Sequence, residues 1–284
     1  MRIFWTHFTT QAERYFRLVR ASRASLIISL LAGLIAICLL RVVTGTPEAL
    51  AVVPEGAAFP SALKVVFILT CINLQRGLLF SVREIVSETE RYEDERLYGL
   101  IPTAYVLSKL AVRGGIAFVQ SLAIVLFVLV LFQAPAAEVV PWGIGLYVTT
   151  WLTIVAALSL GLLLSTVSNN TDQASNLMLF VTIAQIVLSG VLFKVEGAAK
   201  LMSWLAIGRW SVGAYATPID LEGQILGDSI MPGAIVEETL SKLPIPIDPY
   251  AMTFDNLALN WGILLAHILV YVGLACFVKS SARA

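Results

Sequence analysis

The residues of this chain that are best suited to chemistry form a charged segment at positions 83–109. Its side chains recur with the spacing i, i+4, i+7 and i+11, which places them on one face of a helix: Glu84, Glu88, Arg91 and Glu95. Gly99 and Pro102 then end this helix, which is expected to continue directly from the apolar stretch before it. The chemistry is charge pairing rather than catalysis. A charged helix of this kind can dock a soluble partner, or it can simply be a solvated face.

Two apolar stretches carry polar stripes of their own. The stripe in 63–82 lies within a wedge of about 80° and comprises Asn73, Arg76, Phe80 and Arg83. Arg76 lies roughly 10 Å inside the end of the stretch that the charge pattern below assigns to the cytoplasm. A charge at this depth must face protein or water or snorkel back to the interface. The stripe in 174–193 comprises Met178, Thr182, Gln185, Ser189 and Leu192. Such residues either line a path or hold helices together.

No motif in the sequence predicts a catalytic or nucleotide-binding site. It contains no Gly-x-x-x-x-Gly-Lys-Ser/Thr phosphate loop, no His-Glu-x-x-His and no Gly-x-Ser-x-Gly. The three cysteines lie dispersed in apolar runs, and the two histidines have no partner at ligand spacing. We therefore expect no catalytic residue, metal or cofactor in the chain itself.

The elements that position these residues are those of an integral membrane protein. Of the 284 residues, 58% are hydrophobic and 13% are charged, and the mean hydropathy is +0.85. Soluble domains carry about 25% charged residues. The 19 basic and 19 acidic residues give no net charge, whereas a nucleic-acid binder needs a basic surface. The composition predicts contact with membrane lipid and excludes nucleic acid as a partner.

Six stretches are long and apolar enough to cross a bilayer as helices. They are residues 26–43, 63–82, 110–132, 142–167, 174–193 and 257–278. Basic residues gather before the first stretch and between the second and third, whereas 133–141 has none. The positive-inside rule then places both termini and the loop 83–109 in the cytoplasm. The sequence predicts an all-α, multi-pass protein of the cell membrane with six spans in residues 26–284.

Two further segments accompany the spans. In residues 1–25, one face of a helix gathers Trp5, Phe8, Ala12, Tyr15 and Val19, which predicts a cytoplasmic amphipathic helix in the headgroup plane; the alternative is a plain basic flank. Residues 194–256 form the longest extracytoplasmic segment. Its aromatic stretch 201–215 is too short to cross and is expected to re-enter the bilayer edge. The rest cannot be one long helix, because it contains Pro232, Pro244, Pro246 and Pro249.

The segment 83–109 also carries a recognisable motif. It reads Arg-Glu-Ile-x-x-Glu, Tyr-x-x-Glu-Arg-x-x-Gly-Leu and Ala-Tyr-x-x-Ser-Lys, and it strongly resembles the loop after the second span in G-subfamily ABC exporters, the ABC-2-like permease class, in its bacterial branch. The resemblance covers nearly the whole chain. Residues 89–94 depart from it, since they read Thr-Glu-Arg-Tyr-Glu-Asp where the family tends to be basic.

The resemblance implies a membrane half that pairs with a second half, identical or homologous. Residues 1–25 would be its connecting helix, and an ABC ATPase subunit or domain would supply ATP and magnesium. Met1 directly before that helix favours a separate ATPase chain. The residues implied in coupling to the ATPase are Arg83, Glu84, Glu88, Tyr92, Glu95, Arg96 and Gly99.

In the resembled family the second and fifth spans line the substrate path, and Val191 and Leu192 match its apolar valve. The path set is Asn73, Arg76, Phe80, Met178, Thr182, Gln185, Ser189, Val191 and Leu192. The function expected is the permease subunit of an ATP-driven exporter of a lipidic or amphipathic compound. The alternative is a non-transporting membrane anchor or assembly subunit for a soluble partner. A proton-driven carrier is disfavoured because the spans hold no Asp or Glu between their ends.

Overall fold

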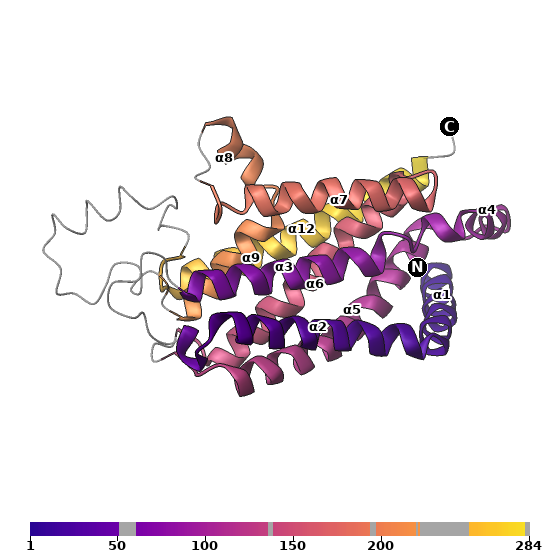
Figure 1. Ribbon diagram of the computed structural model, residues 1–284. Coiled ribbons are helices and arrows are strands. Elements are labelled where there is room, and N and C mark those ends of the chain that lie inside the picture. The colour runs from indigo at the N-terminus through magenta and orange to yellow at the C-terminus, as the bar shows by residue number, and fades with distance from the viewer. Residues whose placement is uncertain (51–60, 136–138, 194–196, 220, 222–249, 282–284) are drawn as a thin grey trace, which may run out of the picture.

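The computed structural model describes residues 1–50, 61–135, 139–193, 197–219, 221 and 250–281, and every regular element in these ranges is helical. Six long helices run side by side as a bundle (Figure 1). They are α2 Arg23–Thr44, α3 Ser61–Ser81, α5 Pro102–Leu131, α6 Trp142–Val167, α7 Thr171–Leu188 and α12 Phe254–Ser281. The bundle agrees with the all-α membrane fold expected from the sequence.

Five helical segments of the described chain are long and apolar enough to span a membrane. They are Leu26–Thr44, Ala62–Leu97, Pro102–Leu131, Trp142–Val167 and Phe254–Ser281. Five of the six predicted stretches are thus confirmed as candidate spans. The remaining one corresponds to α7, which is helical and lies along the bundle but is not among the five. Its first turn is polar, with Thr171, Asp172 and Gln173 directly after the N-cap Asn170.

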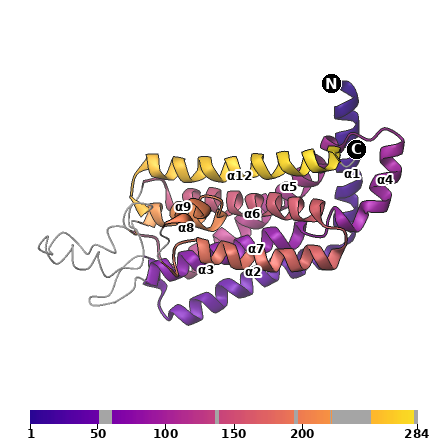
Figure 2. The same ribbon diagram turned by 90° about the horizontal axis from the view of Figure 1, so that it is seen from above.

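The helix α6 forms the centre of the bundle and packs against α3, α5 and α12 (Figure 2). It carries no charged residue and is buried along most of its length, as expected of a helix that is apolar all round. Its close approach to α3 depends on glycine. A Cβ atom on Gly77 would lie 2.5 Å from the Cβ of Ala157, and one on Gly161 would lie 2.0 Å from Ser81 Oγ.

The charged segment does not continue α3 as one helix, and that expectation is wrong. The helix α3 ends at Ser81, a turn follows, and the short 3₁₀ helix η2 Val86–Glu88 precedes α4 Thr89–Leu97. The backbone N–H groups of Ile85 and Val86 donate to Ser165 Oγ on α6, at 2.9 and 3.0 Å. Because these donors bond a side chain of α6 instead of the preceding α3 carbonyls, the chain leaves the helix here.

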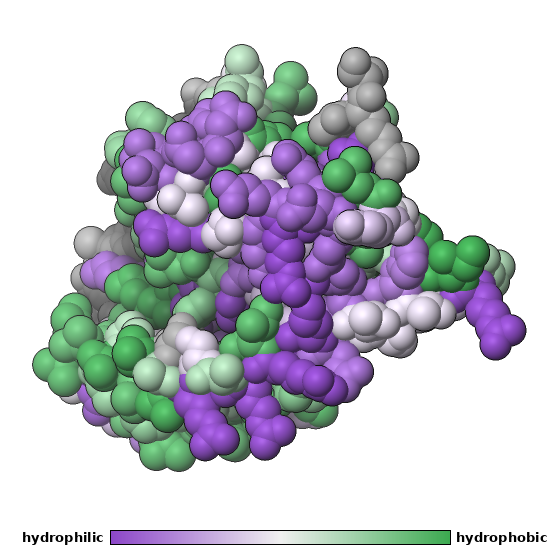
Figure 3. Space-filling view, turned by 90° about the vertical axis from the view of Figure 1, so that its right-hand side faces the viewer, coloured by the Kyte–Doolittle hydropathy of each residue, from purple (hydrophilic) through white to green (hydrophobic). Residues whose placement is uncertain are grey.

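The predicted amphipathic helix forms as α1 Arg2–Ala21, which crosses one end of the bundle beside α4 (Figures 1 and 2). The apolar face of α1 was expected to face the lipid headgroups, but part of it packs against α5, where Tyr15 and Val19 are buried. Among the five residues expected in the headgroup plane, only Trp5 is exposed, at 57%. Polar side chains gather on this end of the molecule (Figure 3).

The aromatic stretch before the last span folds as two short helices, α8 Ala198–Ser203 and α9 Ile207–Ala216. The helix α9 is buried against α3, α6 and α12. Residues 194–196, 220 and 222–249 of the predicted re-entrant segment lie outside the described residues, and so do Pro232, Pro244, Pro246 and Pro249. Within the described part, α9 therefore packs into the bundle, whereas α8 projects from its side (Figure 1), with Leu201 and Met202 exposed.

Candidate functional site

A network of charged and phenolic groups joins α1, α5 and the turn after α3 at the polar end of the bundle. The guanidinium of Arg113 on α5 pairs with Glu84 in the turn, and its Nε donates to Tyr15 Oη at 2.7 Å. The Tyr15 hydroxyl in turn donates to Glu84. Burial, together with the negative charge of Glu84, raises the pKa of Tyr15 above its usual value. The phenol therefore keeps its proton and remains a donor to the carboxylate.

Lys109 anchors the same turn from α5 and is only 1% exposed. Its Nζ lies 2.8 Å from Glu88 Oε2 and donates to the backbone carbonyl of Glu84 at 3.0 Å. The Glu88 carboxylate also accepts from Tyr105 Oη at 3.0 Å. A buried ammonium without such partners would be strongly unfavourable. The position of the turn relative to α5 is therefore fixed by charge as well as by packing.

A second set of contacts joins α1 to α4. Glu95 accepts from Gln11 Nε2 at 2.6 Å and pairs with Arg14, and Arg14 also lies 3.7 Å from Glu88. Arg91 Nε lies 3.1 Å from Glu95 within α4. The side chains of Glu84, Glu88 and Glu95 are only 15%, 21% and 27% exposed. The acidic face predicted to dock a partner is thus occupied by α1 and α5.

The other predicted coupling residues connect α4 and the turn to different helices. Arg83 Nε donates to Ser175 Oγ on α7 at 3.0 Å. Tyr92 is buried, and its ring lies 4.9 Å from that of Tyr105 and beneath the ammonium of Lys279 at the end of α12. Arg96 reaches the Ser280 carbonyl of α12 at 3.5 Å. Gly99 has φ +92°, which favours glycine, in the turn from α4 to α5.

The surface that α4 leaves open differs from the predicted face in every residue but Arg91. It comprises Glu90, Arg91, Glu93, Asp94, Leu97 and Tyr98. Leu97 and Tyr98 are 86% and 92% exposed at the end of α4. We call these six residues the α4 outer surface. Large apolar side chains beside charged ones on a polar end are typical of protein interaction sites.

The predicted path residues of α3 lie within the helix bundle. Asn73 is buried and donates to Tyr215 Oη of α9 at 2.9 Å. Arg76 is 7% exposed and donates to Gln120 Oε1 of α5 at 3.2 Å. Its guanidinium lies against Gly33 of α2, where an added Cβ would be 1.7 Å from Nη1. Arg76 thus faces protein, as the first alternative held, and does not snorkel to the interface.

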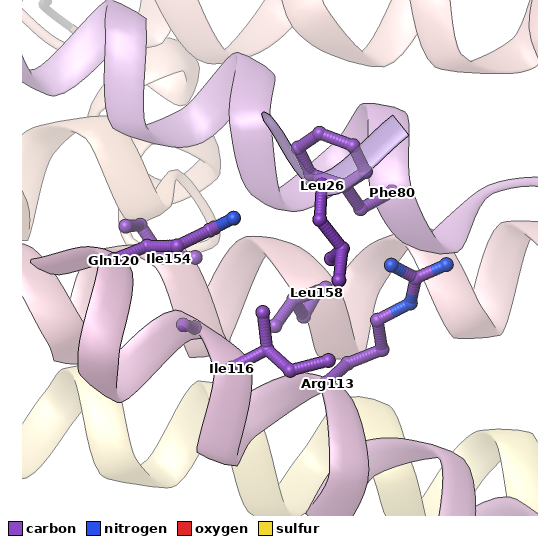
Figure 4. Close-up of a pocket in the computed structure, with 8 residues that line it drawn as sticks. Leu26, Phe80, Arg113, Ile116, Gln120, Ile154 and Leu158 are labelled. Carbon is purple, nitrogen blue, oxygen red and sulfur yellow. The ribbon is translucent and has the colours of Figure 1, made fainter. Parts of the chain in front are cut away.

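Phe80 is only partly buried and is contacted by a cation. The guanidinium carbon of Arg113 lies 5.7 Å from the centre of its ring. Figure 4 shows the two side chains in a small cavity with Leu26, Ile116 and Gln120. The cavity has a volume of about 10 Å³, which is no more than one water molecule needs. Phe80 therefore lies in packed surroundings here.

On α7 the predicted path residues divide into two groups. Met178, Gln185 and Ser189 are buried, and Gln185 Oε1 accepts from the backbone N–H of Gly208 on α9 at 3.2 Å. Thr182 is partly exposed and donates to Gln75 Oε1 of α3 at 3.3 Å. The two residues matched to the valve also differ in exposure: Val191 is buried, whereas Leu192 is 49% exposed. The structure therefore brings Asn73 and Gln185 to the same partner, α9, which agrees with the interhelical hydrogen-bonding alternative.

Sequence reasoning missed four residues of the network, namely Arg14, Tyr15, Lys109 and Arg113, as site residues. A signal for two of them was present. Glu84 and Glu88 are spaced i, i+4 after one span, and Lys109 and Arg113 are spaced i, i+4 at the start of the next. Because a short connection joins the two helices, the acidic pair and the basic pair come to lie at the same level of the bundle. Nothing in the pattern of α1 alone marked Arg14 or Tyr15.

Most of this chain is similar to known proteins. A family described as "ABC-2 type transporter" matches residues 4–217. The chain is also 27% identical over 275 residues to "ABC transporter ATP-binding/permease protein Rv1747" of Mycobacterium tuberculosis (strain ATCC 25618 / H37Rv). The match covers 94% of this chain and 30% of that relative, so the chain spans less than a third of the relative's length. With the helical membrane bundle described above, the chain belongs to the ABC-2 type transporter family and is a membrane permease domain of that family.

Proposed function

We propose that this chain is the permease subunit of an ATP-driven exporter of a lipidic or amphipathic compound, with α1 and α4 on the cytoplasmic side. The observation that carries the proposal is the network joining Tyr15, Glu84 and Arg113 with Lys109 and Glu88. It connects α1 and the turn before α4 to α5, a candidate membrane span. A displacement of α1 or α4 would therefore move the end of a span.

The ATPase that displaces α1 and α4 would be a separate subunit or a further domain. The sequence holds no phosphate-binding loop, and the name of the Mycobacterium tuberculosis relative includes both an ATP-binding and a permease function. The α4 outer surface supplies an apolar tip, Leu97 and Tyr98, among exposed charged residues. We assign this surface, rather than the inward-facing Glu84, Glu88 and Glu95, to contact with the ATPase. ATP and magnesium would bind to the ATPase and not to this chain.

The substrate path would lie between this chain and a second half. We place it on the faces of α3 and α7 that the single chain leaves open. These include Ile68 and Leu79 of α3 and Phe180 and Ile183 of α7, which are 36% to 71% exposed. Gln75 and Thr182, hydrogen-bonded to each other, would contribute the polar part. The buried residues Asn73, Arg76 and Gln185 would support this wall from behind.

Reconstitution tests the proposal directly. The complex isolated from native membranes with its ATPase is placed in liposomes that contain a phospholipid with an NBD fluorophore. Movement of the NBD-phospholipid between leaflets is followed by dithionite quenching, with and without ATP. We expect ATP-dependent movement that stops when the phosphate-loop lysine of the ATPase is replaced. An ATPase that co-purifies and hydrolyses ATP without moving the probe would instead favour the non-transporting anchor.

A further inference from the structure

A groove opens on the side of the bundle between α1, α2 and α5. It has a volume of about 560 Å³, within the range of roughly 300–1,000 Å³ typical of ligand sites. Its walls are Phe16 of α1, three residues of α2 and six of α5. Gln120, at its inner end, is the one polar side chain in this lining, and its Oε1 is hydrogen-bonded to Arg76. The site is therefore apolar along its length.

The position of the groove determines what can fill it. Both α2 and α5 are candidate membrane spans, so the groove opens to the bilayer beside the polar end of the bundle. On α5 it extends from Ala111 to Gln120, which at 1.5 Å per residue is about 13 Å. Half of the roughly 30 Å hydrocarbon core is about 15 Å. The groove thus matches one acyl chain in one leaflet.

Two arginines stand where the headgroup of such a lipid would lie. Arg20 follows Phe16 by four residues on α1, and Arg23 precedes Leu26 and Ile27 by three and four residues on α2. Arg23 therefore lies one turn beyond the wall of α2, toward the bundle end, and Arg20 lies one turn beyond Phe16 along α1, next to the start of α2. Both are exposed, and neither has an acidic partner in the described part of the chain. Each Lys or Arg close to the membrane surface adds about 1 kcal/mol of attraction to anionic lipids.

We propose that this groove binds an anionic phospholipid of the adjacent leaflet. One acyl chain lies along α2 and α5, and the phosphate pairs with Arg20 and Arg23. Phe16 and Tyr15 are neighbours on α1, and they face the groove and the charged network respectively. The lipid would therefore lie against α1, the helix that the charged network joins to α5. Binding itself does not depend on the proposed transport function.

Gly115 offers a way to fill the groove without disturbing the fold. It lines the groove, and a Cβ atom on it would meet no heavy atom within 4 Å. Gly273 of α12 is a matched control, because it is also helical, exposed and open around its Cβ, but lies outside the groove. The variants are G115F and G273F. A third variant, R20Q/R23Q, removes the proposed headgroup partners, with R2Q, at the opposite end of α1 from Arg20, as its control.

The test uses the full chain in liposomes that contain either phosphatidylglycerol or phosphatidylcholine with the same photoreactive acyl chain. Cross-linked peptides are mapped after illumination. We expect phosphatidylglycerol to label the peptides around residues 26–30 and 111–120 at least fivefold more than phosphatidylcholine. Labelling should fall at least fivefold in G115F and approach the phosphatidylcholine level in R20Q/R23Q, while G273F and R2Q remain like the wild type. Equal labelling by the two lipids, or labelling unaffected by G115F, would mean ordinary surrounding lipid and overturn the proposal.

Discussion

The ammonium of Lys109 lies 2.8 Å from the carboxylate of Glu88, and the same ammonium donates to the carbonyl of Glu84. One buried cation therefore holds both the side chain and the backbone of the turn that separates α3 from α4. In a membrane protein a charge in this position is retained only when it is paired. The pair joins the start of a span to the segment that presents the α4 outer surface.

Replacing Lys109 with Met should destabilise the chain by about 3 kcal/mol, the lower end of the roughly 3–5 kcal/mol found when one partner of a buried ion pair is removed. The lower end applies because Glu88 is 21% exposed. Unfolding of the purified chain by denaturing detergent measures the change. The double variant E88Q/K109M should lose clearly less than the sum of the single variants, because the two groups contact each other. Additive losses would mean that the pair contributes no coupling energy.

Replacing Leu97 and Tyr98 with Ala should weaken attachment of the ATPase without affecting stability. These side chains are 86% and 92% exposed and have few internal contacts to lose. A central aromatic residue of an interface typically contributes about 2 kcal/mol or more, which corresponds to roughly a 30-fold weaker Kd. Co-purification from native membranes measures the loss. L201A/M202A, two adjacent exposed apolar residues on α8, is the control and should retain the ATPase.

Replacing Gly77 with Ala should separate α3 from α6. The new methyl group would lie 2.5 Å from both Ala157 Cβ and the Ile154 carbonyl oxygen. Overpacking of this kind costs about 1–3 kcal/mol. G115A adds the same methyl group to a helical glycine with open space around it, and should be neutral or slightly stabilising because Ala favours a helix. Thermal unfolding in detergent compares the two variants. Equal melting temperatures would contradict the close α3–α6 contact.

Single cysteines should distinguish the proposed path from its supporting residues. After Cys38, Cys71 and Cys276 are replaced, cysteines at Gln75 and Ile183 are expected to react with a water-soluble maleimide in the assembled complex. Cysteines at Asn73 and Gln185 should be protected, because both positions are buried and bonded to α9. Leu126 of α5 is 54% exposed and serves as a lipid-facing control that should not react. Reaction at 73 and 185 but not at 75 and 183 would place the path where the sequence stripes alone predicted it.

Much of the fold could be predicted from the sequence because the bilayer restricts it. Apolar stretches of about 20 residues have few alternatives to a spanning helix, and α6 coincides with the predicted 142–167. The break after α3 could not be predicted, because it is caused by a hydroxyl group about 80 residues away in the sequence. The Ser165 hydroxyl accepts hydrogen bonds from the backbone N–H groups of Ile85 and Val86.

The acidic residues of the candidate site were predicted, but their basic and phenolic partners and the directions of the side chains were not. The spacing of Glu84, Glu88 and Glu95 is that of one helix face, yet which face meets solvent depends on the position of α1. That position is set by Arg14 and Tyr15, whose partners are about 70 to 80 residues away. In the same way, helical periodicity groups Asn73 with Arg76 on α3, but only the packing of α9 and α5 shows that they bond different helices.

If the network transmits ATP-driven motion to the membrane helices, Tyr15→Phe should uncouple transport from ATP hydrolysis. This change removes one hydroxyl, a donor to Glu84, and keeps the ring. A hydrogen bond to a charged group contributes about 1.5–3 kcal/mol. The measurement is the number of NBD-phospholipid molecules moved per ATP hydrolysed by the reconstituted complex. Tyr147→Phe is the control, since its hydroxyl bonds the Phe118 carbonyl outside the network. We predict that Tyr15→Phe keeps ATP hydrolysis within about twofold of the wild type but lowers this ratio roughly tenfold or more, in line with that energy. An unchanged ratio in Tyr15→Phe would contradict the account.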